Sequence, residues 1–308
     1  MEIKNVSFVG CGALGMMYAS HMLKSLEPTQ LQFIADPKRI SRYRDTAFYA
    51  NGERQDYRFV PYGSDTEKSE LIIFTVKSYD LEDALASVKG HIDKDTIILS
   101  FLNGVQSEGI IGQTYDPKKV IPSMVAGMDA TRTGNEVMYS QTGYVAFGAG
   151  DGTSQEDLDS LARFFERVRL PYKLDEDIMK TIWWKYMLNV GVNQTSAVLR
   201  APYGFFQDSD DAKDAMLMGM REVYEVSQKM DIGLDESDID EAMRIIGTLA
   251  PEGKTSMLQD ICAQRPTEIE IFAGNLIKLA KEHGVPVPVN TFLYHAIKAL
   301  ESNYGKGF

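Results

Sequence analysis

The stretch "IWWKYMLNVGVN", residues 182–193, carries polar side chains at a spacing that suits chemistry. Lys185, Asn189 and Asn193 are its only charged or amide residues, each four positions after the last. At about 3.6 residues per turn, this spacing predicts a narrow polar stripe on an otherwise apolar helix. Burying such groups is costly unless a polar ligand or side chain meets them. A lysine whose pKa is lowered by burial is also what a general acid near neutral pH requires.

A buried structural network is the other interpretation of the stripe, with Lys185 paired to a carboxylate and the amides bonded to the backbone. The segment "TSMLQDICAQRPTEIE", residues 255–270, holds two more candidates, Ser256 and Glu268. Glu268 is expected in the first turn of a helix, where the helix dipole stabilises a carboxylate whether or not it has another task. Ser256 is expected near a helix start.

The glycine-rich motif "GCGALG" comprises Gly10, Cys11, Gly12, Ala13, Leu14 and Gly15. It follows an apolar run typical of a strand and opens a helix-like stretch, which is the context that dinucleotide binding requires. In that context the glycines permit a tight turn and close approach of the phosphates, which face the positive end of the helix. A glycine-rich turn that binds nothing is the weaker interpretation.

The end of the second expected strand carries mixed signals about the nucleotide. Asp36 lies where a carboxylate bonds the ribose hydroxyls and favours NAD(H). Lys38, Arg39 and Arg42 follow at once. They could bind the 2′-phosphate of NADP(H) if Asp36 turned away, or they could form a solvated first helical turn.

Two further strands are expected to end in polar residues. Lys77 closes "LIIFTVK" and Asn103 closes "TIILSFLN". Ligands of open α/β sheets bind outside the carboxyl ends of the strands, so the pair favours a cleft there. Each residue alone would pass for a solvent-exposed strand end.

The elements that must position these residues fall into two regions. Up to about residue 175, short apolar runs alternate with helix-like stretches, which predicts a Rossmann-type α/β domain with a mainly parallel sheet. The clearest strands are Ile3–Val9, Leu31–Ala35, Leu71–Val76, Thr96–Phe101 and Val120–Ala126. Residues 176–308 show helical periodicity and predict an all-helical substrate and catalytic domain. The expected helices span 177–199, 211–230, 236–249, 267–283 and 290–303, with Thr267 as an N-cap and Gly284 just past a C-terminus.

Composition narrows the class of partner. The net charge of -12, with no basic stripe, argues against nucleic acid and anionic membranes. Only two cysteines occur, which fits a reducing compartment. With no leader-like start and no run of about 18 apolar residues, we expect a cytoplasmic protein. No metal site is expected, and the oligomeric state is left open, with a homodimer as one option.

Taken together, these residues resemble the ketopantoate reductase (2-dehydropantoate 2-reductase) family over nearly the whole chain. The resemblance rests on "GCGALG", "TVK" ending at Lys77, Asn103–Gly104, the Lys185, Asn189 and Asn193 spacing, and "SMLQDI" with "RPTEIE" from Ser256 onward. It implies a Rossmann domain, a helical domain and a cleft between them. The implied reaction is NADPH-dependent reduction of the 2-oxo acid ketopantoate to D-pantoate, towards pantothenate.

The resemblance also implies roles for individual residues. Lys185 would be the general acid, and Glu268 would bind substrate and orient the lysine. The implied substrate contacts are Asn103, Asn189, Asn193 and Ser256. Lys77 would lie beside the cofactor. From the motif and the strand ends, we expect the glycine motif, Asp36, Arg39 and Asn103 to contact the cofactor as well.

Two departures from the family pattern keep alternatives open. NADPH-using members usually place an arginine where this chain has Ala35-Asp36-Pro37, so NAD(H) remains an option. "PYGFF" at 202–206 stands where relatives often carry Asn-Gly. The alternatives are a 2-hydroxyacid dehydrogenase acting on another branched 2-oxo acid and a dinucleotide-binding sensor without chemistry.

Overall fold

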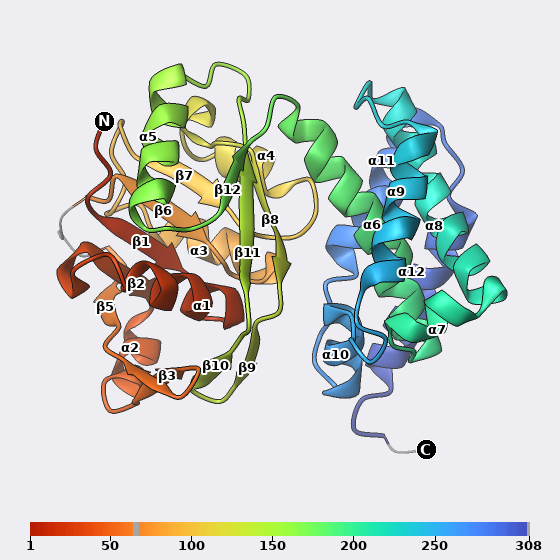
Figure 1. The fold of residues 1–308 in the computed structure, drawn as a ribbon, viewed down its shortest axis with the longest axis horizontal. Helices are drawn as coiled ribbons and strands as arrows, with labels where there is room; N and C mark the ends of the chain where they lie inside the picture. Colours follow the sequence, from red (N-terminus) through yellow and green to blue (C-terminus); the bar gives the residue numbers. More distant parts are fainter. Residues whose placement is uncertain (64–67, 307–308) are drawn as a thin grey trace. The chain divides into compact units, whose positions relative to one another are not determined.

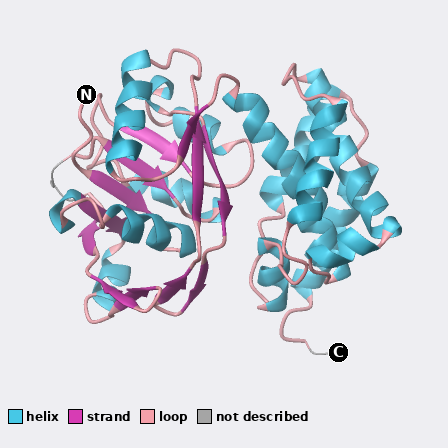
Figure 2. Ribbon diagram, viewed as in Figure 1, coloured by secondary structure: helices cyan, strands magenta, loops and turns pink. Residues whose placement is uncertain are grey.

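The computed structural model describes residues 1–63 and 68–306. The backbone forms two compact units, Met1–Ile178 and Met179–Phe308. The first unit combines helices and strands, whereas the described residues of the second form helices and connecting loops (Figures 1 and 2). This confirms the predicted fold class, an α/β Rossmann-type unit followed by a helical one.

The first unit is built on a five-stranded sheet in the order β5-β2-β1-β6-β7, with every neighbouring pair parallel. Its strands are β1 (Val6–Val9), β2 (Leu31–Ala35), β5 (Arg58–Pro61), β6 (Leu71–Phe74) and β7 (Ile97–Ser100). The helices of this unit are α1 (Ala13–Met22), α2 (Pro37–Tyr43), α3 (Leu81–Ser87), α4 (Ser107–Gly112) and α5 (Gln155–Arg167). Short 3₁₀ turns are η1 (Pro28–Gln30), η2 (Ser78–Asp80) and η3 (Pro117–Lys119). β1 lies at the centre, so its carboxyl end is flanked by the ends of β2 and β6.

Both faces of this sheet are covered, which explains the uninterrupted apolar runs of its central strands. Neighbouring residues along a strand point to opposite faces. Phe8 and Ile73 therefore join one hydrophobic cluster, while Val9, Ile72 and Phe74 join another.

Two smaller sheets complete the first unit. One has the order β4-β3-β10-β9, formed by Glu53–Gln55, Phe48–Ala50, Glu136–Met138 and Thr131–Thr133. The other has the order β12-β11-β8, formed by Tyr172–Leu174, Thr142–Phe147 and Ser123–Met128. The β8 strand corrects the expected Val120–Ala126 strand. Val120 makes an isolated parallel bridge to Ile98. β8 then pairs antiparallel with β11, with Ser123 opposite Phe147.

The longest helices of the second unit are α6 (Ile178–Leu199) and α8 (Asp210–Lys229) (Figure 1). The others are α7 (Tyr203–Asp208), α9 (Glu236–Thr248), α10 (Ser256–Cys262), α11 (Asn275–His283) and α12 (Pro288–Ser302). α8 packs against α7, α9, α11 and α12. α6 and α8 approach closely at Gly191 and Gly219, since a Cβ on Gly219 would lie 3.7 Å from the Cα of Gly191.

The expected helix over 267–283 is only partly correct. α11 begins at Asn275 and is preceded by a π-helical turn, η4 (Glu270–Gly274), in which the Gly274 N–H donates to the Ile269 carbonyl at 3.0 Å. Thr267 and Glu268 precede this turn, so Glu268 is not in the first turn of a regular helix as predicted. Gly284 does end α11 in the left-handed conformation, with φ 69°.

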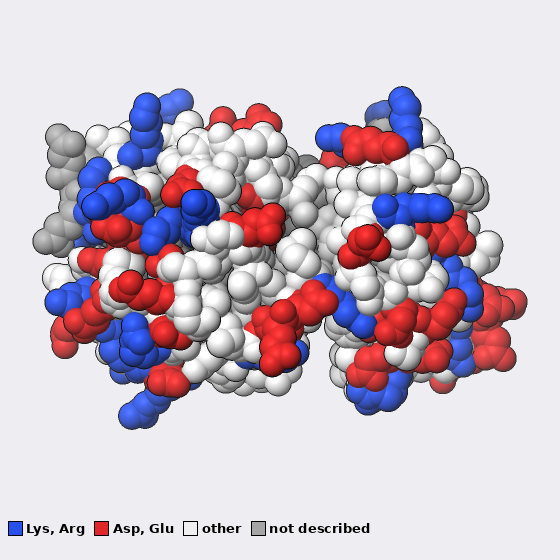
Figure 3. Space-filling view, turned by 90° about the horizontal axis from the view of Figure 1, so that it is seen from above, with Lys and Arg blue, Asp and Glu red and all other residues white. Residues whose placement is uncertain are grey.

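Acidic and basic side chains are mixed over the face drawn in Figure 3. Among the described residues, no helix is both long enough and apolar enough to cross a bilayer.

Candidate active site

The glycine-rich turn between β1 and α1 is shaped by close backbone packing. Gly10 has φ +113°, which L-residues rarely adopt, and a Cβ there would lie 2.7 Å from the backbone carbon of Thr75. A Cβ on Gly15 would collide with the Gly10 carbonyl and lie 2.8 Å from the Thr75 hydroxyl oxygen. That hydroxyl donates to the Gly10 carbonyl at 2.7 Å. Two of the three glycines are therefore required by the protein's own packing.

The remaining glycine of the motif, Gly12, faces more open space. A Cβ on Gly12 would meet only the Thr75 carbonyl, at 3.9 Å. Gly12 precedes α1, which begins with Ala13 and Leu14, and neither an acidic residue in its first turn nor a side-chain cap is present among the described residues. The first N–H groups of α1 can therefore bind an anion, and the positive end of the helix dipole favours one. This arrangement fits a dinucleotide pyrophosphate.

An arginine that the sequence analysis did not identify reaches this turn. Arg132 of β9 donates from its guanidinium to the Cys11 carbonyl and, through Nε, to the Gly134 carbonyl at 2.7 Å. Burial raises the pKa of the Cys11 thiol to about 12, although the charges of Arg132 and Arg39 act in the opposite direction. Cys11 is therefore a neutral packing group at physiological pH, beside two guanidinium groups.

The carboxylate of Asp36 is turned into α2. Its Oδ1 accepts the backbone N–H of Arg39 at 2.8 Å, and its Oδ2 lies 3.2 Å from Arg39 Nε. Asp36 is thus both the N-cap of α2 and the ion-pair partner of Arg39. Arg39 keeps nearly half of its side chain exposed, at 47%.

Lys77 and Asn103 lie at neighbouring strand ends, as the sequence predicted. Lys77 directly precedes η2 after β6, and Asn103 follows β7 in a bend before Gly104, whose φ is +93°. Because the strand order is β2-β1-β6-β7, Asp36, the glycine turn, Lys77 and Asn103 follow one another along a single sheet edge. This is the edge at which doubly wound sheets bind nucleotides.

In the second unit, Lys185, Asn189 and Asn193 all lie on α6 and form the expected line. Asn193 is buried, whereas Lys185 and Asn189 are half-buried. The adjacent line of the same helix, Tyr186 and Gln194, is buried completely. The polar stripe thus lies beside a line of fully buried side chains, which pack α6 into its unit.

Glu268 and Ser256 lie on other segments of the second unit. Glu268 is buried, with 6% exposure, in the turn before η4. Ser256 is the exposed first residue of α10, and Thr255 before it caps that helix by accepting the Leu258 N–H at 3.1 Å.

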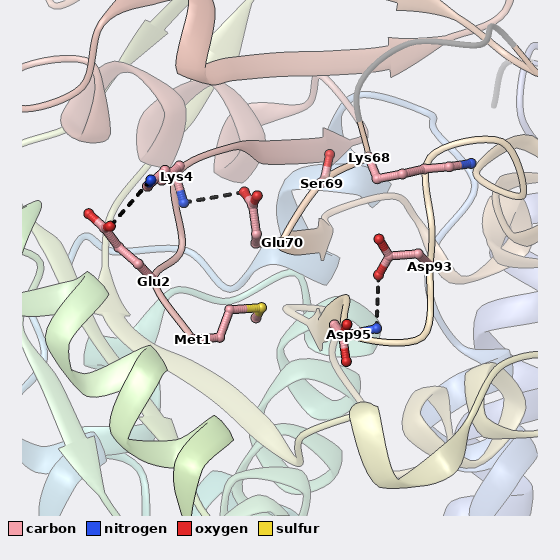
Figure 4. A pocket seen from close by; sticks show the side chains of 8 residues that line it. All are labelled: Met1, Glu2, Lys4, Lys68, Ser69, Glu70, Asp93 and Asp95. Carbon is pink, nitrogen blue, oxygen red and sulfur yellow. Dashed lines mark hydrogen bonds and ion pairs between the residues drawn. The ribbon is translucent and has the colours of Figure 1, made fainter.

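A polar hollow of about 340 Å³ lies at the opposite ends of the strands. Its lining comprises Met1, Glu2, Lys4, Lys68, Ser69, Glu70, Asp93 and Asp95, which precede β1, β6 and β7 (Figure 4). Glu70 accepts the Asn5 N–H at 2.6 Å, and Asp93 accepts the Asp95 N–H at 2.8 Å. These carboxylates stabilise loop backbone, and the hollow is remote from the glycine turn.

A parallel sheet with this turn at its centre is the framework of a dinucleotide-binding protein, and in this chain a helical unit with lysine and amide side chains on one line follows it. Two family models match the chain. Residues 6–152 match "Ketopantoate reductase PanE/ApbA", and residues 177–301 match "Ketopantoate reductase PanE/ApbA C terminal". The chain belongs to the ketopantoate reductase family.

Individual relatives are similar to this chain over nearly its full length. The 2-dehydropantoate 2-reductase of Aquifex aeolicus is 26% identical over 299 residues, covering 95% of this chain and 96% of the relative. A ketopantoate reductase structure from Ralstonia eutropha superposes with a TM-score of 0.82 at 22% identity, covering 97% of this chain and 99% of that one. A D-mandelate dehydrogenase with NADH and anilino(oxo)acetate gives 0.86 at 22% identity, with the same coverage. The two structures establish the shared fold.

Proposed function

We propose that this protein reduces ketopantoate to D-pantoate, a step towards pantothenate, with NADPH as the reductant. The observation that carries the proposal is the Lys185, Asn189 and Asn193 line on α6, in a chain matched by both ketopantoate reductase models. The glycine turn, whose geometry fits a pyrophosphate, supports the dinucleotide half.

When bound, the cofactor supplies a hydride to the ketone carbon. The chain's own residues must then handle the negative charge that develops on the ketone oxygen. We assign the Lys185 ammonium as the proton donor to that oxygen, and the side-chain N–H groups of Asn189 and Asn193 as additional donors. Fixed donors of this kind stabilise the transition state more than the ground state, because the ketone oxygen carries more negative charge there than in the bound ketone. The products are a neutral hydroxyl and a neutral lysine, which regains its proton from solvent.

The remaining predicted residues hold the reactants. Glu268 is assigned to orient Lys185, and Ser256 and Asn103 to bind polar groups of the substrate. Lys77 and the residues of the glycine motif are assigned to the cofactor.

The direct test is loss of NADPH absorbance on addition of ketopantoate, for wild type and for Lys185→Met. Removing the proton donor is expected to lower kcat by about 10²- to 10⁴-fold. NADPH affinity, measured by fluorescence titration, should be unchanged. The matched control is Lys180→Met on the same helix, where Lys180 pairs with Asp235 and Asp238 at 3.2 and 3.1 Å. Wild type that binds NADPH but does not turn over ketopantoate would overturn the substrate assignment.

The preference for NADPH is supported by the position of the Asp36 carboxylate. Both of its oxygens are engaged with Arg39, which leaves fewer acceptor positions for ribose hydroxyls. Arg132 donates to the Cys11 carbonyl, and Arg39 lies in the first turn of α2 at the end of β2, the strand next to β1, so two positive charges lie near the glycine turn. A 2′-phosphate would find a charge-assisted partner in Arg39.

Dissociation constants for NADPH and NADH distinguish the two cofactors. Arg39→Met is expected to weaken NADPH about 10- to 100-fold, the usual loss for a hydrogen bond to a charged group, with little change for NADH. Asp36→Asn removes a negative charge from the same site and should tighten NADPH. If Asp36→Asn instead weakens NADH selectively and Arg39→Met changes nothing, the protein is an NADH enzyme.

A further inference from the structure

The π-helical turn η4 follows Glu268 and is held by side chains from α6. The Tyr186 hydroxyl donates to the Phe272 carbonyl at 2.7 Å, and the Gln194 Oε1 accepts the Ala273 N–H at 3.1 Å. Tyr186, Gln194, Phe272 and Ala273 are each at most 1% exposed. A buried backbone N–H without a partner is costly, so the bond from the Ala273 N–H to Gln194 stabilises the π-helical turn. The Tyr186 hydroxyl adds a second bond to the same turn, at the Phe272 carbonyl.

Gln194 is itself fixed by a buried network. Its Nε2 donates to the Val190 carbonyl at 2.7 Å and to Asn290 Oδ1 at 2.8 Å. Asn290 in turn donates from Nδ2 to Glu222 at 2.7 Å, and Glu222 accepts the Val289 N–H at 2.7 Å. The network therefore connects α6, α8, α12 and η4, and each polar group in it has a defined orientation.

The segment before Glu268 is anchored separately. Both the backbone N–H and the hydroxyl of Thr267 donate to Glu301 Oε1, at 2.7 and 2.8 Å. Glu268 is thus held between an anchor on α12 and the η4 turn. The Ile271 N–H also donates to the Glu268 carbonyl, at 3.2 Å, and ties Glu268 to that turn.

The two anchors on α6 directly follow two residues of the polar stripe. Tyr186 is next to Lys185, and Gln194 is next to Asn193. Successive residues of a helix differ by about 100° in direction, so the helix presents the stripe on one line and holds η4 with the neighbouring line. The same turns of α6 thus position the proton donor and the segment that carries Glu268.

We propose that Tyr186 and Gln194 are positioning residues, which hold η4 so that Glu268 keeps its place relative to Lys185 and Asn189. This inference rests on the proposed function for the roles of Lys185 and Glu268. A misplacement of about 1 Å at a reacting group can cost as much as 10²-fold in rate.

Tyr186→Phe is the sharpest variant, because it removes one hydroxyl and leaves the ring packed on Phe272, 6.4 Å away between centroids. We expect kcat for ketopantoate to fall about tenfold, with little change in KM or in NADPH affinity. The matched control is Tyr115→Phe in the first unit, where the hydroxyl donates to the Leu85 carbonyl at 2.6 Å. This control should keep its kcat.

A double-mutant cycle with Glu268→Ala separates positioning from a general structural effect. If Tyr186 acts through Glu268, Tyr186→Phe should have no further effect on kcat in the Glu268→Ala background, because the residue it positions is gone. An equal tenfold loss in both backgrounds would overturn the inference. Gln194→Met provides a second variant that should behave in the same way.

Hydrogen exchange tests the inference without any turnover. Amide exchange over residues 268–274, followed by mass spectrometry, should accelerate at least several-fold in Tyr186→Phe and not in Tyr115→Phe. Unchanged exchange would overturn the inference whatever reaction the protein catalyses. If wild type does not reduce ketopantoate but exchange still accelerates in Tyr186→Phe, the proposed substrate is wrong. The conclusion that Tyr186 and Gln194 hold η4 would then still stand.

Discussion

The turn after β1 and the stripe on α6 differ in what makes them suited to chemistry. The turn depends on the absence of side chains, because Gly10 and Gly15 lie against Thr75 at distances that a Cβ could not tolerate. The stripe depends on side chains that an apolar helix would otherwise lack, with Lys185 and two amides on one line. Adding an atom should therefore damage the first region, and removing a polar group should damage the second.

The two regions also differ in how they are supported. Backbone contacts between adjacent strands fix the turn, and the Thr75 hydroxyl adds bonds to the Val9 and Gly10 carbonyls at 3.3 and 2.7 Å. α6 is fixed by buried side chains of neighbouring helices, including the Gln194, Asn290 and Glu222 network. The turn is thus supported mainly through backbone contacts, whereas α6 is supported through a network of buried side chains.

The largest loss of stability and of cofactor binding is expected from Gly10→Ala, which adds a side-chain atom to the glycine turn. The added Cβ would meet the backbone of Thr75 and Val76 at 2.7 Å, and alanine is strained at φ +113°. We expect about 2–4 kcal/mol of lost unfolding free energy, in the range of overpacking and strained backbone, and NADPH binding weakened beyond 100-fold. Chemical denaturation and fluorescence titration measure the two effects.

The matched control for that substitution is Gly109→Ala in α4, where a Cβ would meet nothing within 4 Å. Alanine is favoured over glycine inside a helix, so this variant should gain up to about 1 kcal/mol and bind NADPH normally. Equal behaviour of the two variants would show that the turn is not constrained as the geometry implies.

These constraints explain why some features could be predicted from sequence and others could not. The glycine motif, Lys77 and Asn103 follow apolar runs directly, so their places at strand ends are local properties of the sequence. Arg132 reaches the turn only because β10 pairs with β3, a contact between distant segments that "TRT" does not reveal. The π-helical turn was also missed, since the apolar periodicity of 267–283 resembles that of a continuous helix until Tyr186 and Gln194 are seen to bind it.

Arg132→Met tests whether a side chain contributes to cofactor binding at the glycine turn after β1. The guanidinium holds the Cys11 carbonyl and adds positive charge beside the turn, so we expect the NADPH dissociation constant to rise about tenfold. The control is Arg54→Met on the same small sheet, where Arg54 is 70% exposed and pairs with Asp56 at 3.6 Å. Lower thermal stability with unchanged NADPH affinity would show that Arg132 only anchors its hairpin.

The smallest expected effect is a pH dependence of the unfolding free energy. We expect it from the buried His91 of the first unit and not from the exposed His295 of the second. Burial lowers the pKa of His91 below its ordinary value, the positive charge of Lys68 lowers it further, and the hydrogen bond with the Pro61 carbonyl at 3.3 Å opposes them. The unfolded chain takes up a proton near pH 6.5 while the folded imidazole remains neutral, so protons favour unfolding below that pH. The contribution of His91 to stability is therefore complete above about pH 6.5 and is lost as the pH falls towards the folded pKa. Denaturation at pH 7.5 and 5.5 should show a smaller decrease in unfolding free energy for His91→Asn than for wild type, whereas His295→Asn, at an exposed position of the second unit, should match wild type.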